Sequence, residues 1–472
     1  MDNISFFDGN QKFKIDKPIR LIELFGGYGS QHFALEYLGA NFEQWKLCEW
    51  AVKSIQAYKD AHCQNDNTDY SKDLTKEQIV EFLANKGISA DYNKPMTYDQ
   101  VKRLSEDKLR TIYNNIKATH NLVNIQQAHA KDFEIEDTDK YCYMMTYSFP
   151  CQDLSKAGLG KGMAKDSGTR SGMLWEVERI LDECENLPQV LVMENVPDVI
   201  GTKNIGHFAK WLEKLESLGY HCYWQVLNAK DYGVPQNRER CFMVSILGDY
   251  YYEFPKAMKL EKRLKDLLEN MVAENYYLSD RMIEYFEKHS KECENKGSGF
   301  RFNPIENTEV VAKAVTTRAG CRMDDNFIKI NGKQCKVTKD NENFIEWKSK
   351  GLLDSDCRAW KSERISGTLT CKGNNKIVTN EPVAYDEQNN YIRKDECVGT
   401  LTTDGSSPKH NNRVIENCRI RKLTPKECFR LMGVKDQDYE KIAENQSNAS
   451  LYHLAGDSIV VDVLVEIFRR ML

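Results

Sequence analysis

Short apolar segments that end in glycine or polar turns recur through the first half of the chain. Residues 19–25 are mostly apolar, three glycines follow within the next four residues, and a helical pattern covers 31–38. Compact apolar runs at 141–147 and 190–193 also end in loops. Strand, glycine turn and helix in this order predict a doubly wound α/β domain with a mostly parallel sheet.

Two other patterns occur in the chain, one within the series of strands and helices and one after it. Between residues 63 and 121, apolar positions at helical spacing predict amphipathic helices at 75–86 and 97–120, an insertion to which the sequence assigns no function. After about residue 246, short segments with alternating polar and β-branched residues predict a smaller β-rich domain. Helical periodicity returns from residue 421.

These shifts in pattern define the expected domains. We expect a first α/β domain at 1–246, a β-rich domain at 247–420, and a closing segment at 421–472. The last stretch, 458–472, reads as an apolar helix and is expected to pack back onto the first domain.

The composition is typical of a soluble globular protein. Of the 472 residues, 41% are hydrophobic and 29% are charged, which is enough to bury a sizeable core. No apolar run approaches the roughly 18 residues needed to cross a bilayer. The first residues lack the basic start and apolar stretch of a secretory signal. We therefore expect a cytoplasmic protein.

Charge and cysteine usage narrow the chemistry. The net charge of −5 does not indicate a nucleic-acid binder, but residues 296–420 hold 21 Lys and Arg against 17 Asp and Glu, which favours a polyanion partner there. The 15 cysteines occur singly without a CxxC pair, so no metal site or redox pair is expected. Buried, inert thiols are the default interpretation in a reducing compartment.

The first candidate site combines the turn FGGYG at 25–29 with Glu49 and Trp50. A glycine turn after a strand lets the backbone approach a ligand at a helix N-terminus. An acidic group after the next strand can hold two ribose hydroxyls, and the adjacent indole can stack on adenine. Dinucleotides, S-adenosylmethionine and plain tight packing all use such turns. A solvated Glu49 beside a core Trp50 is the alternative.

Cys151 follows a buried strand in the sequence Ser-Phe-Pro-Cys-Gln, where α/β domains place their sites. A thiolate there is a strong, soft nucleophile. The loop at 153–172 is rich in Gly, Ser and basic residues and is suited to closing over a phosphate backbone, although a plain solvated loop is the alternative.

Two further polar motifs lie beside predicted strands. Glu194 ends one strand in the sequence Met-Glu-Asn-Val-Pro, where a carboxyl group can act as an acid or a hydrogen-bond partner. Arg238 and Arg240 occupy alternate positions of Gln-Asn-Arg-Glu-Arg, so both point the same way from an extended chain. Their direction suits an anionic or carbonyl-rich ligand, and a surface charge pair is the alternative.

Taken together, these motifs resemble those of the cytosine carbon-5 DNA methyltransferases of bacterial or phage type. The resemblance is carried by the ordered set FGGYG, CEW, PCQ, ENV, QNRER, RKLTPKECFRLMG and AGDS, over about the first 246 and the last 52 residues. It implies a Rossmann-like, S-adenosylmethionine-dependent domain with a target-recognition domain between these parts.

The resemblance also implies a role for each matching residue. Cys151 would be the nucleophile, Glu194 the partner of the ring nitrogen and Arg238 the contact to the cytosine carbonyl, with Arg240 beside it. Gln152, Ser155, Lys156 and Gln236 would contact DNA. The S-adenosylmethionine pocket would comprise Phe25, Gly27, Tyr28, Gly29, Ser30, Glu49, Trp50, Asp132, Phe133, Pro150, Leu174, Asp457 and Ser458.

The implied chemistry explains these residue types. Thiolate addition to carbon 6 makes carbon 5 of cytosine nucleophilic, and a carboxyl group and a guanidinium stabilise the charge that develops. The ring cannot be reached inside a duplex, so the base must be flipped out. The implied partner is duplex DNA, bound by a monomer, with a cognate restriction nuclease as a further candidate. One residue departs from the family, because Asp457 stands where Gly-Asn-Ser is usual.

Three alternatives stay open on the sequence. A related subgroup methylates transfer RNA, so the substrate could be RNA with the same chemistry. A binding protein that has lost activity is the second, against which Cys151, Glu194 and Arg238 all argue. The third, a dehydrogenase, explains the glycine turn but not the other motifs.

Overall fold

The computed structural model describes residues 11–150, 170–331, 383–386, 391–392, 413–415 and 418–472. The chain divides into two compact units. The first contains Met1–Leu268, Thr308–Cys321 and Thr424–Leu472, and the second contains Glu269–Asn307 and Arg322–Leu423.

The first unit is larger than the sequence pattern suggested. It includes residues 247–268 and 308–321, which were expected in the β-rich domain. Backbone hydrogen bonds explain the difference, because the Leu264 N–H donates to the Val310 carbonyl at 3.1 Å and the Ala312 N–H donates to the Pro235 carbonyl at 2.8 Å.

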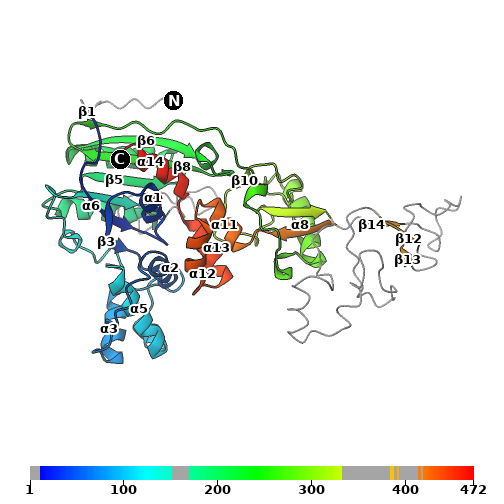
Figure 1. Ribbon diagram of the computed structural model, residues 1–472, viewed down its shortest axis with the longest axis horizontal. Helices are drawn as coiled ribbons and strands as arrows, with labels where there is room; N and C mark the ends of the chain where they lie inside the picture. The colour runs from blue at the N-terminus through cyan, green and yellow to red at the C-terminus, as the bar shows by residue number, and fades with distance from the viewer. Residues whose placement is uncertain (1–10, 151–169, 332–382, 387–390, 393–412, 416–417) are drawn as a thin grey trace. The chain divides into compact units, whose positions relative to one another are not determined.

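A six-stranded sheet forms the centre of the first unit, in the order β3-β2-β4-β5-β8-β6 (Figure 1). Every described neighbour pair is parallel except the two that involve β8, which runs antiparallel to both β5 and β6. The expected α/β fold with a mostly parallel sheet is confirmed. The strands are β2 (Ile19–Leu24), β3 (Phe42–Cys48), β4 (Cys142–Tyr147), β5 (Val190–Asn195), β6 (Tyr220–Asn228) and β8 (Glu239–Leu247).

The central strands are apolar because both faces of the sheet are covered. Every residue of β4 and β5 is buried, as expected for parallel strands between two helical layers. The covering helices include α1, which packs against α14. The helices beside the sheet are α1 (Ser30–Leu38), α2 (Val52–His62), α6 (Leu174–Glu183), α7 (Ile205–Ser217) and α14 (Val461–Arg469).

The insertion forms three helices, α3 (Lys76–Lys86), α4 (Tyr98–Lys102) and α5 (Glu106–Ala118), with α3 and α5 projecting below the sheet in Figure 1. The sequence predicted one helix over 97–120, whereas the structure has two. Ser105 is the reason, because its side chain caps the N-terminus of α5 by accepting a hydrogen bond from the Lys108 N–H. These helices pack around an apolar core of their own.

The C-terminal segment returns to the first unit as four helices. Thr424 begins α11 through a capping box with Glu427, which is the local signature of a helix start. The helices before α14 are α11 (Pro425–Leu431), α12 (Asp436–Ala443) and α13 (Asn448–Asp457). Among the described residues, no helix has both the length and the apolar character to span a membrane.

The second unit combines a helix with short strands. Its described core contains Phe286, Met323 and Phe327. Its elements are α8 (Asp280–Asn295), β11 (Phe327–Asn331) paired with β15 (Cys418–Lys422), and β12 (Val383–Asp386) paired with both β13 (Tyr391–Ile392) and β14 (Arg413–Ile415). Short two-stranded ladders of the first unit pair β1 (Gln11–Lys12) with β9 (Tyr250–Tyr251), and β7 (Gln236–Asn237) with β10 (Ala312–Lys313).

Candidate active site

A cavity of about 380 Å³ opens at the carboxyl ends of the parallel strands of the first unit. Its wall includes Phe25 after β2, Glu49 after β3, Ser148 after β4 and Glu194 within β5. Doubly wound sheets place their ligands at this edge. Motifs that lie far apart in the sequence therefore share one cavity.

The glycine turn holds the Glu49 carboxylate. Gly27 has a φ of 57°, and its N–H donates to Glu49 Oε2 at 3.0 Å. The Ala51 N–H donates to Oε1 at 2.8 Å. Burial raises the pKa of Glu49 to about 7, and these two hydrogen bonds oppose the rise. The carboxylate is thus fixed at the cavity wall and gains its charge near neutral pH.

The other residues of this turn divide into two groups. Phe25 and Ser30 line the cavity, as does Trp50, and all three were expected in the cofactor pocket. Tyr28 and Gly29 do not line it. The Tyr28 hydroxyl is buried and accepts a hydrogen bond from Ser458 Oγ at 2.8 Å, and a Cβ on Gly29 would lie 2.4 Å from His62 Nε2. Tyr28 and Gly29 therefore shape the turn.

Glu194 forms an ion pair with one of the two arginines. Arg240 Nε lies 3.0 Å from Glu194 Oε1, and Ser148 Oγ donates to Oε2 at 2.6 Å. Glu194 is only 6% exposed, and both Glu194 and Arg240 line the cavity. A carboxyl group and a guanidinium thus meet at the cavity wall, where they can bind adjacent polar atoms of one planar ligand.

Arg238 is held by backbone carbonyls. Its Nη1 donates to the Val315 carbonyl at 2.9 Å, and its Nη2 donates to the carbonyls of Gly456 and Ser458 at 3.0 and 2.8 Å. The side chain is 5% exposed, although it borders the cavity. Arg238 therefore joins three segments of the first unit, and its Nη1 and Nη2 groups both donate to protein carbonyls.

Gln236 is fully buried, which contradicts its predicted position at a DNA-contacting surface. Its Nε2 donates to the Leu431 carbonyl at 2.6 Å, and its Oε1 accepts from the Val315 N–H at 2.9 Å. Residues at alternate positions of an extended chain point the same way, so Gln236 faces the protein interior together with Arg238.

Asp457 and Ser458, which were expected in the cofactor pocket, both line the cavity. Enclosure raises the pKa of Asp457 to about 6, with the Arg238 cation opposing the rise and the Glu194 carboxylate adding to it. Gly456 explains the close approach of the backbone, because a Cβ there would lie 2.2 Å from the carbonyl carbon of Thr316.

Besides Tyr28 and Gly29, three predicted cofactor residues lie outside the cavity lining. The Asp132 carboxylate accepts a hydrogen bond from the His129 N–H at 2.9 Å and so caps the short 3₁₀ helix Ala130–Phe133. Phe133 and Leu174 are completely buried in the core beneath the sheet. Met173, the residue before Leu174, lines the cavity instead.

A segment that no sequence motif identified forms part of the cavity wall. Asn124, Ile125 and Gln126 line the cavity. The available sequence signal is the apolar pair Leu122 and Val123 followed by the polar Asn124. The structure shows that this segment extends the sheet, through a parallel bridge between Asn121 and Leu47.

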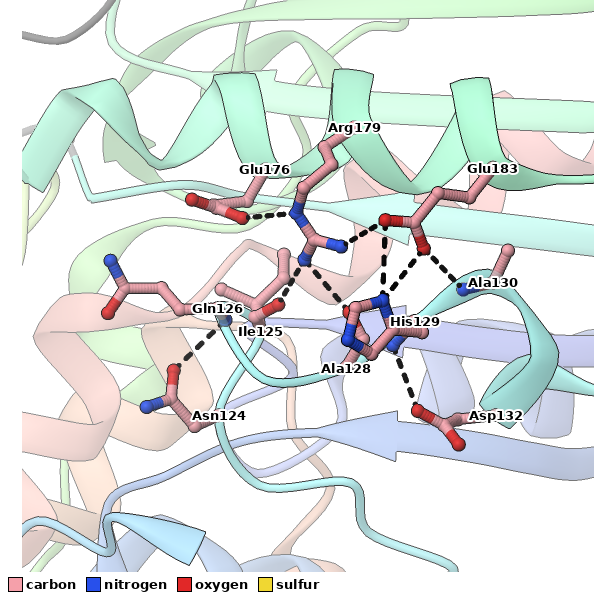
Figure 2. A network of polar contacts seen from close by, with 10 residues as sticks. All are labelled: Asn124, Ile125, Gln126, Ala128, His129, Ala130, Asp132, Glu176, Arg179 and Glu183. Carbon is pink, nitrogen blue, oxygen red and sulfur yellow. Dashed lines mark hydrogen bonds and ion pairs between the residues drawn. The ribbon is translucent and has the colours of Figure 1, made fainter.

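Arg179 of α6 holds this segment in place (Figure 2). Its Nη2 donates to the carbonyls of Ile125 and Ala128 at 3.0 and 2.8 Å. Glu183, four residues further along α6, holds the same loop, since its Oε2 accepts from the Ala130 N–H at 3.1 Å. Arg179 also forms ion pairs with Glu176 and Glu183, both at 2.8 Å, which orient the guanidinium.

The predicted nucleophile Cys151 lies outside the described residues, as do Gln152, Ser155 and Lys156. The residue before Cys151 is described, and Pro150 lines the cavity. Asn195 holds the preceding backbone, because its Nδ2 donates to the Phe149 carbonyl at 2.9 Å. The chain thus enters the Cys151 segment from the cavity wall.

Part of the helical insertion also borders the cavity. Four residues between α3 and α4 belong to the lining, and His453 of α13 lies beside them. Nothing in the sequence pattern identified them, because they follow no motif. The four residues are Tyr92, Asn93, Lys94 and Pro95.

Comparisons with known proteins agree with this geometry. A family model described as C-5 cytosine-specific DNA methylase matches residues 100–472. The chain is 36% identical over 465 residues to the orphan methyltransferase M.SssI of Spiroplasma monobiae, with 96% of this chain and 97% of that relative covered. It is 30% identical over 457 residues to the type II methyltransferase M2.ScrFI of Lactococcus lactis subsp. cremoris, with 96% and 99% covered.

A solved structure shares the fold. The methyltransferase EhMeth of Entamoeba histolytica superimposes with a TM-score of 0.54 at 14% identity, covering 97% of this chain and 98% of that one. At this low identity the similarity shows the fold alone.

Proposed function

This chain belongs to the C-5 cytosine-specific DNA methylase family, and on that premise we propose that it is an S-adenosylmethionine-dependent DNA (cytosine-5-)-methyltransferase. In this proposal the cavity binds the cofactor beside a cytosine flipped out of duplex DNA. The observation that carries it is the single cavity shared by Glu49, the Glu194–Arg240 pair and Pro150, the residue before Cys151.

The cavity wall fits the proposed cofactor in charge and shape. Besides Glu194, which is paired with Arg240, the carboxylates of Glu49 and Asp457 line it, and they suit a ligand with a cationic sulfonium. Glu49 would accept hydrogen bonds from the ribose hydroxyls, Trp50 would stack on the adenine, and Asn124 would lie at the adenine edge. When bound, the cofactor supplies an electrophilic methyl group.

The residues of this chain would activate the cytosine. The Cys151 sulfur adds to carbon 6, and negative charge develops on the ring nitrogen N3 and the carbonyl oxygen. A protonated Glu194 carboxyl group that donates its proton to N3 would neutralise the charge there. After methylation, loss of the carbon-5 proton and expulsion of the Cys151 sulfur restore the aromatic ring.

We assign the contact with the cytosine carbonyl to Arg240, in place of the Arg238 implied by the resemblance. Arg240 pairs with Glu194 at 3.0 Å, so both groups can reach the same base. The guanidinium of Arg238 donates to three backbone carbonyls, which gives it a positioning role.

We further propose that the second unit reads the target sequence and that the chain acts on DNA as a monomer. The lysine and arginine side chains in the described part of the second unit are compatible with contacts to phosphates, which dominate affinity for nucleic acid. A cognate restriction nuclease is a further proposed partner. Co-purification of the expressed chain with its genomic neighbours would test that partnership.

The test of the proposed function measures transfer of a labelled methyl group from S-adenosylmethionine to duplex DNA and to transfer RNA. We expect transfer to duplex DNA, with Cys151→Ser abolishing turnover while cofactor affinity stays nearly unchanged. Duplex DNA carrying 5-fluorocytosine should form a denaturation-resistant adduct with the wild-type chain only. Labelling of transfer RNA but not of duplex DNA would refute the DNA substrate.

A second pair of variants tests the catalytic pair. Glu194→Gln and Arg240→Ala should each slow single-turnover methylation by about 10²-fold or more, the typical loss when one stabilising group is removed. Arg238→Lys should instead lower stability. Near-normal single-turnover rates for Glu194→Gln would remove that residue from catalysis.

A further inference from the structure

The helical insertion brings an aromatic residue into the wall of the cavity. We propose that Tyr92, stacked on His453, is a positioning residue that covers bound S-adenosylmethionine. This inference rests on the proposed function, because it names a further cofactor-binding element of the same cavity. It gives the insertion between α2 and Asn121 a role in cofactor binding.

The segment that carries Tyr92 is tied to the cofactor side of the sheet. The Ser89 N–H donates to the Trp50 carbonyl at 2.8 Å, and the Val52 N–H donates to the Ser89 carbonyl at 2.9 Å. These bonds flank the residue that would stack on adenine. A change in the Ser89 segment would therefore also shift the Trp50 backbone.

Local hydrogen bonds fold the segment into a compact turn. Ser89 Oγ donates to the Lys94 carbonyl at 2.8 Å, and Asp91 Oδ1 accepts from the N–H groups of Asn93 and Lys94 at 2.9 and 3.2 Å. Within this turn Tyr92 has a φ of 61°. A bulky side chain in the left-handed region is strained, and such strain persists where the surrounding structure enforces it, often at ligand sites.

Tyr92 and His453 form a stacked pair at the cavity. Their ring centroids are 3.9 Å apart with an interplanar angle of 16°, and both residues line the cavity. Burial lowers the pKa of His453, with Lys53 and Arg318 adding to the effect, so the imidazole is neutral at physiological pH. The stack thus joins the insertion to α13, the helix that carries Gly456 and Asp457.

The position of the Tyr92 phenol matches the charged part of the proposed ligand. Tyr92 lines the same cavity as Glu49 and Asp457, and burial raises the pKa of its phenol, with both carboxylates adding to the rise. A ring in this wall can cover part of the bound cofactor, and an aromatic face attracts a cation such as the sulfonium.

The experiment measures cofactor affinity of the full-length chain by titration calorimetry with S-adenosylmethionine. Tyr92→Ala should raise Kd on the order of tenfold, since about 1.4 kcal/mol of aromatic contact corresponds to that factor. Tyr92→Phe should stay near wild type because the ring is kept. Tyr98→Ala is the matched control, because Tyr98 lies on the same insertion, is 49% exposed and does not line the cavity.

Two further variants separate the ring from the backbone. Tyr92→Gly removes the side chain while favouring the positive φ, so it should bind as weakly as Tyr92→Ala without loss of folding. His453→Ala should weaken binding similarly, and the double variant Tyr92→Ala with His453→Ala should lose little more than either single one. The cofactor KM should rise in parallel with Kd.

The outcomes distinguish this inference from the proposed function. Wild-type affinity in both Tyr92→Ala and Tyr92→Gly would overturn the role of Tyr92 while leaving the methyltransferase proposal intact. Strictly additive losses in the double variant would refute the stacked pair as the covering unit. Failure of the wild-type chain to bind S-adenosylmethionine would refute the proposed function itself, and this inference with it.

Discussion

The ionisation of Glu49 should control the pH dependence of cofactor binding. Its carboxylate accepts hydrogen bonds from Gly27 and Ala51, and burial raises its pKa to about 7. The ribose hydroxyls of the proposed cofactor need an acceptor, so the ionised form is the one that binds. Affinity should therefore be highest above pH 7 and should fall as the pH drops through 7.

The size of the effect follows from the ionised fraction. With a pKa of about 7, roughly nine-tenths of Glu49 is ionised at pH 8 and roughly one-tenth at pH 6. The apparent Kd is divided by the competent fraction, so Kd should rise by about tenfold between pH 8 and pH 6. Asp457, whose pKa is raised to about 6, adds at most about a further twofold at pH 6.

The assay is calorimetric titration with S-adenosylmethionine at pH 6, 7 and 8 for wild type, Glu49→Gln and Asp457→Asn. Glu49→Gln should bind more weakly at pH 8 but show little change with pH, while Asp457→Asn should keep the transition near pH 7. The ligand's own titration is common to all three proteins and cancels in the comparison. An equal pH slope in wild type and Glu49→Gln would refute the reasoning.

Three further substitutions test parts of the scaffold. Arg179→Ala leaves the carbonyls of Ile125 and Ala128 without their donor, and it should raise the cofactor KM by about tenfold with a smaller effect on kcat. Arg179→Lys should restore cofactor binding only in part, because an ammonium group lacks the planar, two-pronged geometry of a guanidinium. Gln236→Ala leaves buried groups of Leu431 and Val315 without their partner and should lower the free energy of unfolding by about 1–3 kcal/mol for each, measured in urea; an unchanged midpoint would contradict it. Gly456→Ala forces a Cβ against the Thr316 backbone and should cost about 1–3 kcal/mol or more, seen as a lower melting temperature.

The sequence alone was sufficient to predict the fold and to predict which edge of the sheet carries the candidate site. Apolar strands followed by glycine or polar turns are local patterns, and parallel strands bring such turns to one edge. Glu49 and Glu194 were predicted on this basis and Pro150 from the family resemblance, and all three line one cavity. The family resemblance, carried by the same motifs, is confirmed by the family model.

The tertiary structure decided which polar residues face that cavity. The alternation of side chains along residues 236–240 predicts that positions 236, 238 and 240 point the same way. Only the packed structure shows that Gln236 is buried, that Arg238 donates to backbone carbonyls, and that Arg240 pairs with Glu194. Likewise Asn124 lines the cavity and Asp132 does not, and the backbone beside Asn124 is held by Arg179, which lies 54 residues after Ile125. Tyr92 enters the wall through its stack on His453. Contacts of this kind join residues far apart in the chain, so no local pattern encodes them.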